Sequence, residues 1–385
     1  MALKGIKVVE FAGLAPAPFC GMILSDFGAN VIRIDKVKST DFVPDSLSRG
    51  KRSIAIDLKS KSGISIVKKL CKYSDVLIEP FRPGIMEKFG LDPKTLLIEN
   101  PGLIYARLTG YGQNGPYAKM AGHDLNYLAI SGVLSKLGRK GQKPTPPVNL
   151  LADFAGGGLI CAFGILAALF ERTKSGRGQI IDSNMVVEGA AYVSSFLFTT
   201  QNDKQFFWSG QVRGNNLLDT GSPVYDTYET LDGKFVALAC LEPKFLLNFL
   251  SAVKIDFDPS LLQKEKKEIF KARLCELFKT KTRREWWDIF RKIDACLTPV
   301  LEFDEAFHDE HNSRENGTFI ENENRIMEPR SAPRLSSMTE TNFNVKKPFV
   351  GQHTKEILSE IGYSEEEIRT LIDYGVVEFM INSKL

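Results

Sequence analysis

Short hydrophobic segments alternate with helical-looking stretches through the first 110 residues of the chain. Five such segments are rich in Val and Ile, at residues 6–11, 31–35, 53–58, 76–81 and 103–108. A short apolar run predicts a strand buried on both faces, and the stretches between the runs predict crossover helices. We therefore expect an α/β fold with a Rossmann-like parallel sheet, helices on both of its faces, and a ligand crevice at the carboxyl ends of the strands.

A second pattern begins near residue 150. The 17 residues from Phe154 to Phe170 are all apolar or glycine. This run is shorter than a membrane span usually is, so it predicts a buried core helix and no membrane span. A turn at 175–178 and a strand-like segment at 179–185 follow, which adds one more strand to the same domain.

The remainder of the chain predicts a smaller domain. Residues 225–320 alternate a short hairpin with amphipathic helices, as in an α+β fold. Ser364 and Glu367 form a capping-box pattern at the start of a last helix. The predicted organisation is a large Rossmann-like domain at 1–199, a linker at 200–224, a small α+β domain at 225–320, and a linker with a C-terminal helix returning to the large domain at 321–385.

The loop after the first predicted strand argues against a dinucleotide enzyme. Such an enzyme would carry G-x-G-x-x-G there, but residues 12–18 read AGLAPAP. The charge balance argues against a nucleic-acid partner, because 50 basic and 47 acidic residues give a net charge of only +3. Six widely spaced cysteines fit a reducing compartment and form no metal motif.

Two short segments suggest catalytic chemistry. His123, in the GHDLNY segment, has an unperturbed pKa near neutrality and suits a general base, although a loop histidine bonded to backbone is the alternative. Asp153 precedes a glycine-rich helix start, so it can serve as an N-cap, and burial would have to raise its pKa for acid–base work. The glycines 156–158 can present amides to an enolate oxygen or simply allow close helix packing.

These segments, together with others in the same order, resemble the acyl-CoA racemases of the family III CoA-transferase superfamily. The resemblance covers nearly the whole chain and includes residues 75–82, 103–115, 122–127, 149–158, 225–228, 241–245 and 294–301. It implies an isomerase that interconverts the (2R) and (2S) forms of 2-methylacyl-CoA thioesters by proton transfer through an enolate, in branched-chain fatty acid and bile acid metabolism. It also implies an interlocked homodimer, and no cofactor or metal besides the CoA of the substrate.

The resemblance also implies roles for particular residues. His123 and Asp153 are expected to be the two bases on opposite faces of the α-carbon, and Glu242 is expected to orient His123. The expected contacts of the CoA moiety are Lys36, Ile56, Asp57, Leu58, Lys59, Gly122, His123, Asp124, Leu125, Asn126 and Tyr127. Lysine at position 36 keeps the charge of the arginine that is common there, but it loses bidentate phosphate binding.

Two other functions compete with the epimerase. A CoA-transferase would use Asp153 as a nucleophile that forms an acyl anhydride and would not require His123. A silent acyl-CoA-binding protein would require neither residue. The chain ends in Ser383-Lys384-Leu385, the tripeptide that the peroxisomal import receptor reads, so we expect a peroxisomal enzyme. The sequence leaves open a second, mitochondrial pool and the preferred acyl chain.

Overall fold

The computed structural model describes residues 1–38, 46–204, 207–208, 212–256, 258–263, 266–322, 324–337 and 346–379. The chain divides into two compact units. The first consists of Met1–Ser131, Val148–Ser194 and Glu315–Leu385, and the second of Gly132–Pro147 and Ser195–Arg314. Residues 132–147, which the sequence pattern placed within the large domain, thus group with the second unit. The terminal tripeptide lies outside the described residues.

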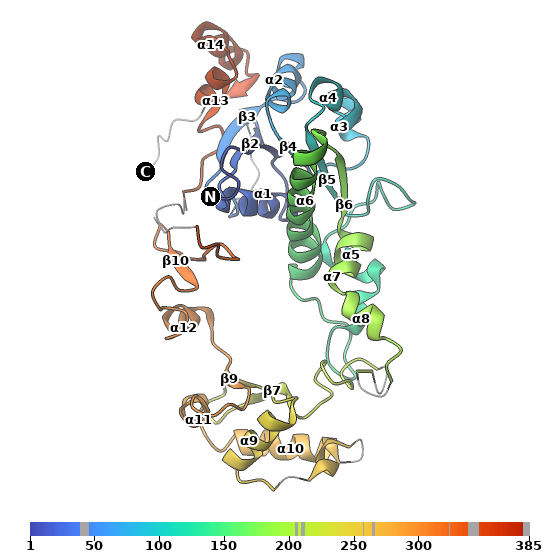
Figure 1. Ribbon diagram of the computed structural model, residues 1–385, viewed down its shortest axis with the longest axis vertical. Coiled ribbons are helices and arrows are strands. Elements are labelled where there is room, and N and C mark those ends of the chain that lie inside the picture. Colours follow the sequence, from blue (N-terminus) through green and yellow to red (C-terminus); the bar gives the residue numbers. More distant parts are fainter. Residues whose placement is uncertain are drawn as a thin grey trace. The chain divides into compact units, whose positions relative to one another are not determined.

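A seven-stranded sheet forms the centre of the first unit (Figure 1). Its order is β12-β3-β2-β1-β4-β5-β6, and every neighbouring pair is parallel except β12 with β3. The strands are β1 (Lys7–Phe11), β2 (Asn30–Lys36), β3 (Arg52–Ile56), β4 (Val76–Glu79), β5 (Ile104–Thr109), β6 (Ile180–Asn184) and β12 (Val377–Glu378). The five strands predicted from the early apolar runs are confirmed.

Helices cover both faces of this sheet, as predicted. Side chains from α2 (Lys61–Lys72), α4 (Pro93–Glu99), α13 (Thr354–Glu360) and α14 (Glu365–Asp373) share one buried cluster with alternate residues of the strands. On the opposite face lie α1 (Pro16–Asp26) and α6 (Ile160–Ser175). There Lys51 and Glu10 form a fully buried ion pair at 2.8 Å, and the Lys51 ammonium also donates to the Pro18 carbonyl.

The strand order reverses between β1 and β4. The strands β2 and β3 lie on one side of β1, and the strands β4, β5 and β6 lie on the other. This is the place where open α/β sheets bind ligands, because the loops after the two strands diverge there. The short helix α3 (Ile85–Lys88) and the loop before α5 (Asp124–Ser131) both lie beyond carboxyl ends of strands. The predicted site segments therefore follow the strands at the edge where a crevice is expected.

A long helical segment runs from Leu150 to Ser175, beginning as the π-helix η2 (Leu150–Leu159) and continuing as α6. It is 26 residues long, and an 18-residue window within it has a mean hydropathy of 1.9, so by length and composition alone it could cross a membrane. The expectation of a buried core helix is only half right, because one face packs on the sheet and the other is exposed. Four large apolar side chains follow one another on the exposed face of α6 and the last residue of η2. They are Leu159 (49%), Phe163 (63%), Leu166 (41%) and Phe170 (66%), called here the α6 stripe.

The second unit is an α+β fold, as predicted. Its antiparallel sheet has the order β7-β8-β9, formed by β7 (Tyr225–Glu229), β8 (Phe235–Ala239) and β9 (Leu297–Pro299). An aromatic cluster is its core, with Phe278 stacked on Tyr228 at 5.0 Å between ring centroids and Trp286 packed edge-on at 5.2 Å. The surrounding helices are α9 (Pro243–Ala252), α10 (Lys267–Phe278) and α11 (Arg283–Phe290).

The last part of the chain returns to the first unit. The hairpin of β10 (Phe319–Glu321) and β11 (Met327–Pro329) lies in a region that the sequence pattern predicted as loop. The start of α14 is as predicted, because the Ser364 hydroxyl accepts from the Glu367 amide and the Glu367 carboxylate accepts from the Ser364 amide. β12 then pairs with β3, which adds an antiparallel strand that the sequence pattern did not predict.

Candidate active site

His123 lies on the loop directly before α5, and its imidazole is exposed. The His123 carbonyl accepts hydrogen bonds from the amides of Asn126 and Tyr127, and the His123 amide donates to the Asn126 side chain at 3.1 Å. These bonds fix the backbone of the loop while they leave both ring nitrogens available. An exposed imidazole on a fixed loop can reach a ligand and exchange a proton with it.

Tyr127 holds the same loop from inside the unit. Its buried hydroxyl donates to the Gly122 carbonyl at 2.5 Å, and its ring meets Tyr111 edge-on with centroids 5.1 Å apart. A Cβ at Gly122 would lie 2.7 Å from the Tyr127 ring, so only glycine lets the loop pass over the tyrosine. Burial, and then the negative charge of Asp153, raises the pKa of Tyr127 to about 12.

Asp153 lies in the first turn of η2 and is half-buried. The prediction that it is the N-cap is wrong, because Asn149 occupies that position. The Asn149 amide instead donates to the Asp153 carboxylate at 3.2 Å. The backbone amides of Ala152 and Asp153 donate to the carboxylate of Asp124, at 2.7 and 2.9 Å, so the cap of this turn comes from the residue directly after His123.

Several neighbours act on the protonation of Asp153. Burial raises the pKa of the carboxyl above its ordinary value, and the negative charge of Asp124 adds to the increase. The Asn149 hydrogen bond and the positive charge of His123 lower the pKa, but they do not cancel the effect of burial. Asp124, which follows His123 directly in the chain, accepts the Asp153 amide at 2.9 Å, so the two candidate bases lie on adjoining segments of the first unit. A carboxyl with a raised pKa can both accept and return a proton.

The three glycines after Asp153 are explained by close packing. A Cβ on Gly156 would lie 2.5 Å from the backbone of Gly189 in η3 (Met185–Ala190), and one on Gly158 would lie 2.7 Å from the Pro16 carbonyl. The alternative role, amides held free for an enolate oxygen, does not apply to the amides of Ala152 and Asp153, since both are bonded to Asp124.

Residues expected to contact CoA lie at the ends of β2 and β3. Lys36 ends β2 and is exposed, whereas Ile56 ends β3 and is almost completely buried, so Ile56 can shape this region only from the core. Asp57 accepts from the Lys59 amide at 3.0 Å and thereby turns the chain into α2.

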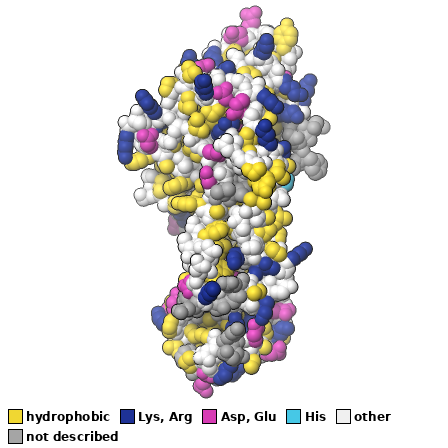
Figure 2. Space-filling model, turned by 90° about the vertical axis from the view of Figure 1, so that its right-hand side faces the viewer, with side chains coloured by type: hydrophobic (Ala, Val, Ile, Leu, Met, Phe, Trp, Pro, Cys, Tyr) yellow, Lys and Arg dark blue, Asp and Glu magenta, His cyan; other side chains and the backbone are white. Residues whose placement is uncertain are grey.

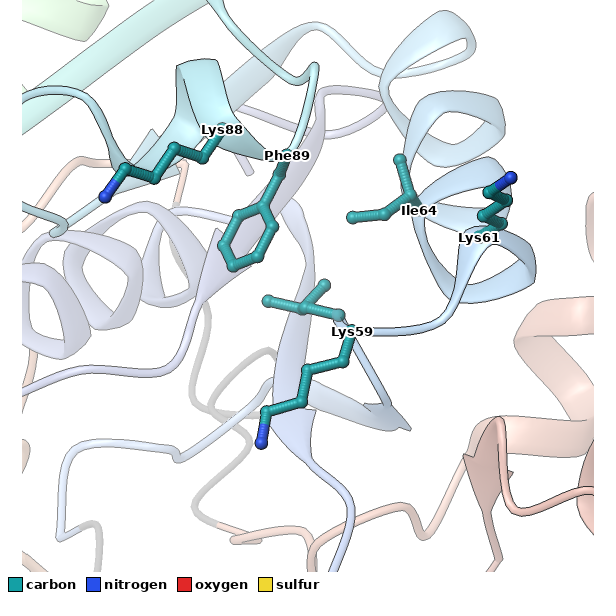
Figure 3. Close-up of a pocket in the computed structure, with 6 residues that line it drawn as sticks. Lys59, Lys61, Ile64, Lys88 and Phe89 are labelled. Carbon is teal, nitrogen blue, oxygen red and sulfur yellow. The ribbon is translucent and has the colours of Figure 1, made fainter.

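A cavity of about 390 Å³ opens beside this turn (Figure 3). Figure 3 shows Phe89, after α3, and Ile64, on α2, on opposite sides of it. Its lining consists of Leu58, Lys59, Lys61, Ile64, Lys88 and Phe89. Lys61 and Lys88 were not predicted. Three lysines belong to this lining, and Figure 3 shows Lys61 and Lys88 extending away from Phe89 and Ile64. Positive charge beside an apolar surface is suited to a ligand that has phosphate groups and a flat apolar part.

The last candidate from the sequence, Glu242, belongs to the second unit. Glu242 is the exposed N-cap residue of α9 in the second unit, so the structure does not test its predicted contact with His123. Arg107 is buried and forms ion pairs with Glu79 at 2.8 Å and Glu87 at 3.0 Å, which supports a structural role. Burial raises the pKa of Glu79 to about 7.

Among the described residues, no three His, Cys, Asp or Glu side chains are grouped to hold a metal ion.

Comparisons with known proteins identify relatives over almost the full length. Residues 3–354 match the model of CoA-transferase family III. The alpha-methylacyl-CoA racemases of Mus musculus and Homo sapiens are 51% and 50% identical, each over 98% of this chain and 98% of the relative. The beta subunit of succinyl-CoA–L-malate CoA-transferase from Chloroflexus aurantiacus is 32% identical over 98% of both chains. A CAIB/BAIF family protein from Brucella suis has the same fold, with a TM-score of 0.76 and 25% identity, covering 93% of this chain and 99% of that one.

Proposed function

The chain belongs to CoA-transferase family III, and from this premise we propose that it is a racemase that interconverts (2R)- and (2S)-2-methylacyl-CoA thioesters. Identity of about half with racemases, against about a third with transferases, supports the isomerase assignment. The observation that carries the proposal is that the loop of His123 and the turn of the half-buried Asp153 adjoin, because Asp124, the residue after His123, accepts the Asp153 amide at 2.9 Å.

The proposed reaction removes a proton from one face of a carbon and delivers another proton to the opposite face. One of the two groups, His123 or Asp153, removes the proton from the carbon next to the thioester, and the electron pair passes to the thioester oxygen as an enolate. The other group then donates a proton to the opposite face of that carbon, which inverts its configuration. Each group is a base in one direction and an acid in the other, so the raised pKa of Asp153 suits both of its roles.

The lysine-lined cavity supports CoA as the carrier of the acyl group. Lys59, Lys61 and Lys88 supply positive charge for the phosphates, and the α2 N-terminus adjoins the same cavity. Phe89 and Ile64 offer an apolar surface for the adenine ring. The pantetheine arm would then extend along the carboxyl ends of the strands to the loop at 122–127.

A heavy-water experiment separates this function from its main rival. With a 2-methylacyl-CoA of either configuration, we expect deuterium at the α-carbon, inversion of configuration and an intact thioester. His123→Ala and Asp153→Asn should each lower the epimerisation rate by at least about 10²-fold. An unchanged α-hydrogen, together with CoA transfer that depends on a free carboxylate acceptor and survives His123→Ala, would instead establish the transferase.

Two further proposals concern assembly and location. The exposed α6 stripe supports a homodimer in which a second copy covers it, and Glu242 then orients a catalytic His123 in the assembled enzyme. The terminal Ser383-Lys384-Leu385 supports import into peroxisomes through its receptor. A chain that lacks these three residues should remain outside peroxisomes in cells where the intact chain is imported.

A further inference from the structure

Asp124 connects the two segments that carry the proposed bases. It follows His123 directly in the chain, and one of its carboxylate oxygens, Oδ2, accepts the amides of Ala152 and Asp153. The residue is only 2% exposed, so these hydrogen bonds are shielded from water. The loop of His123 and the first turn of η2 are therefore joined through a single side chain.

This contact differs from an ordinary helix cap. The acceptor, Asp124, lies 28 residues before the amide of Ala152 in the chain. The local N-cap residue, Asn149, instead donates its side-chain amide to the Asp153 carboxylate. Across the part of the chain that the structure describes, the second oxygen of Asp124, Oδ1, has no hydrogen-bond partner although it is buried. A contact selected for stability alone would normally pair both oxygens of a buried carboxylate.

We propose that Asp124 is a positioning residue, which clamps the His123 loop to the Asp153 turn and so fixes the spacing of the two bases across the α-carbon. The inference rests on the racemase function proposed above. Inversion requires both groups to reach opposite faces of one carbon, whereas hydrogen exchange requires only one group to reach it. Loss of the clamp should therefore impair inversion more than exchange.

The test measures both rates in the full-length protein. For each epimer in heavy water, the rate of deuterium incorporation and the rate of inversion are followed in the wild type, Asp124→Ala and Asp124→Asn. In Asp124→Ala we expect inversion to fall by about 10²-fold and incorporation to fall much less, so that the ratio of incorporation to inversion rises. Asp124→Asn keeps an oxygen that can accept both amides, so its ratio should stay near that of the wild type.

Asp75→Asn is the matched control. Asp75 also lies in the first unit and accepts a backbone amide, that of Lys7 at 2.7 Å. It directly precedes β4, however, and so lies at the amino ends of the strands and not at their carboxyl ends. We expect this variant to change thermal stability without changing the ratio. If Asp124→Ala does not fold, Asp124→Glu replaces it, since the longer side chain keeps the acceptor but shifts the spacing and should also raise the ratio.

Each result has one interpretation. A ratio that stays at the wild-type value in both Asp124→Ala and Asp124→Glu, or that rises equally in Asp75→Asn, overturns the clamp. Failure of the wild type itself to exchange the α-hydrogen would instead overturn the racemase function, so the two failures are distinguishable.

Discussion

At the scale of single residues, Asp153 shows how neighbours set the usefulness of a carboxyl group. Burial favours its neutral form, whereas the Asn149 amide and the charge of His123 favour its ionised form. A group that must act as a base in one direction and an acid in the other gains from such opposing influences, because a raised pKa favours return of the proton. Asn149 is thus part of the site, although the sequence analysis gave it no role of its own.

We predict that Asn149→Ala raises the pKa of Asp153 further, because it removes a hydrogen bond that stabilises the carboxylate. For the epimer whose proton Asp153 removes, the carboxyl must be ionised. The acidic limb of the pH profile of kcat/KM should therefore move to higher pH. Asn30→Ala, which removes an exposed amide at the amino end of β2, is the control and should leave the limb in place. A shift to lower pH in Asn149→Ala would contradict this account.

At the scale of elements, the site depends on the crossing of η2 and η3. Gly156 and Gly189 bring the two backbones into contact, and Asp153 lies one turn before the crossing. The direction of the Asp153 side chain is therefore coupled to the packing of two helices. A side chain at the crossing would have to move backbone, which is far less adaptable than a neighbouring side chain.

Gly156→Ala should lower the free energy of unfolding by about 1–3 kcal/mol, because its Cβ would lie 2.5 Å from the Gly189 carbonyl carbon. It should also reduce epimerisation. Gly164→Ala is the control, since a Cβ there would meet Ile181 at an ordinary 3.5 Å and alanine favours the helix. Urea-induced unfolding measures the free energy of unfolding of both variants. The explanation by packing fails if Gly156→Ala is as stable as Gly164→Ala.

The same scale shows what the sequence could and could not reveal. Strands β1 to β5 were predictable, because burial on both faces leaves continuous Val- and Ile-rich runs. β12 was not, since two residues carry no periodicity and its partner β3 is nearly the whole chain away. The position of Asp153 near a helix start was predictable, but its cap was not, because Asp124 reaches it only through the tertiary fold.

At the scale of the whole molecule, the α6 stripe is the clearest sign of a missing partner. Four large apolar side chains follow one another at helical spacing on a helix whose opposite face is in the core. Several groups of hydrophobic side chains are also visible on the face shown in Figure 2. Large apolar patches on a folded protein usually mark an interaction site, and a second copy of the chain is the partner proposed here.

If the proposed homodimer forms through the stripe, Phe163→Glu should convert it to a monomer, because the substitution places a charge in the middle of the stripe. Analytical ultracentrifugation at several concentrations measures the change. Ile98→Glu is the control, at a 75% exposed position of α4 outside the stripe, and it should leave the number of chains in the sedimenting particle unchanged. A Phe163→Glu variant that sediments like the wild type would exclude the stripe as the dimer interface.

The late position of β12 also has a consequence for synthesis of the chain. β3 is made early, but the strand that covers its outer edge comes nearly a full chain length later, together with Thr354, whose hydroxyl donates to the Glu378 carbonyl at 2.7 Å. Until those residues leave the ribosome, the edge of β3 presents unpaired backbone groups beside the lysine-lined cavity. Nascent chains that stall before this point would expose a sheet edge that is prone to aggregation, so chaperone protection is most needed during translation of the second unit.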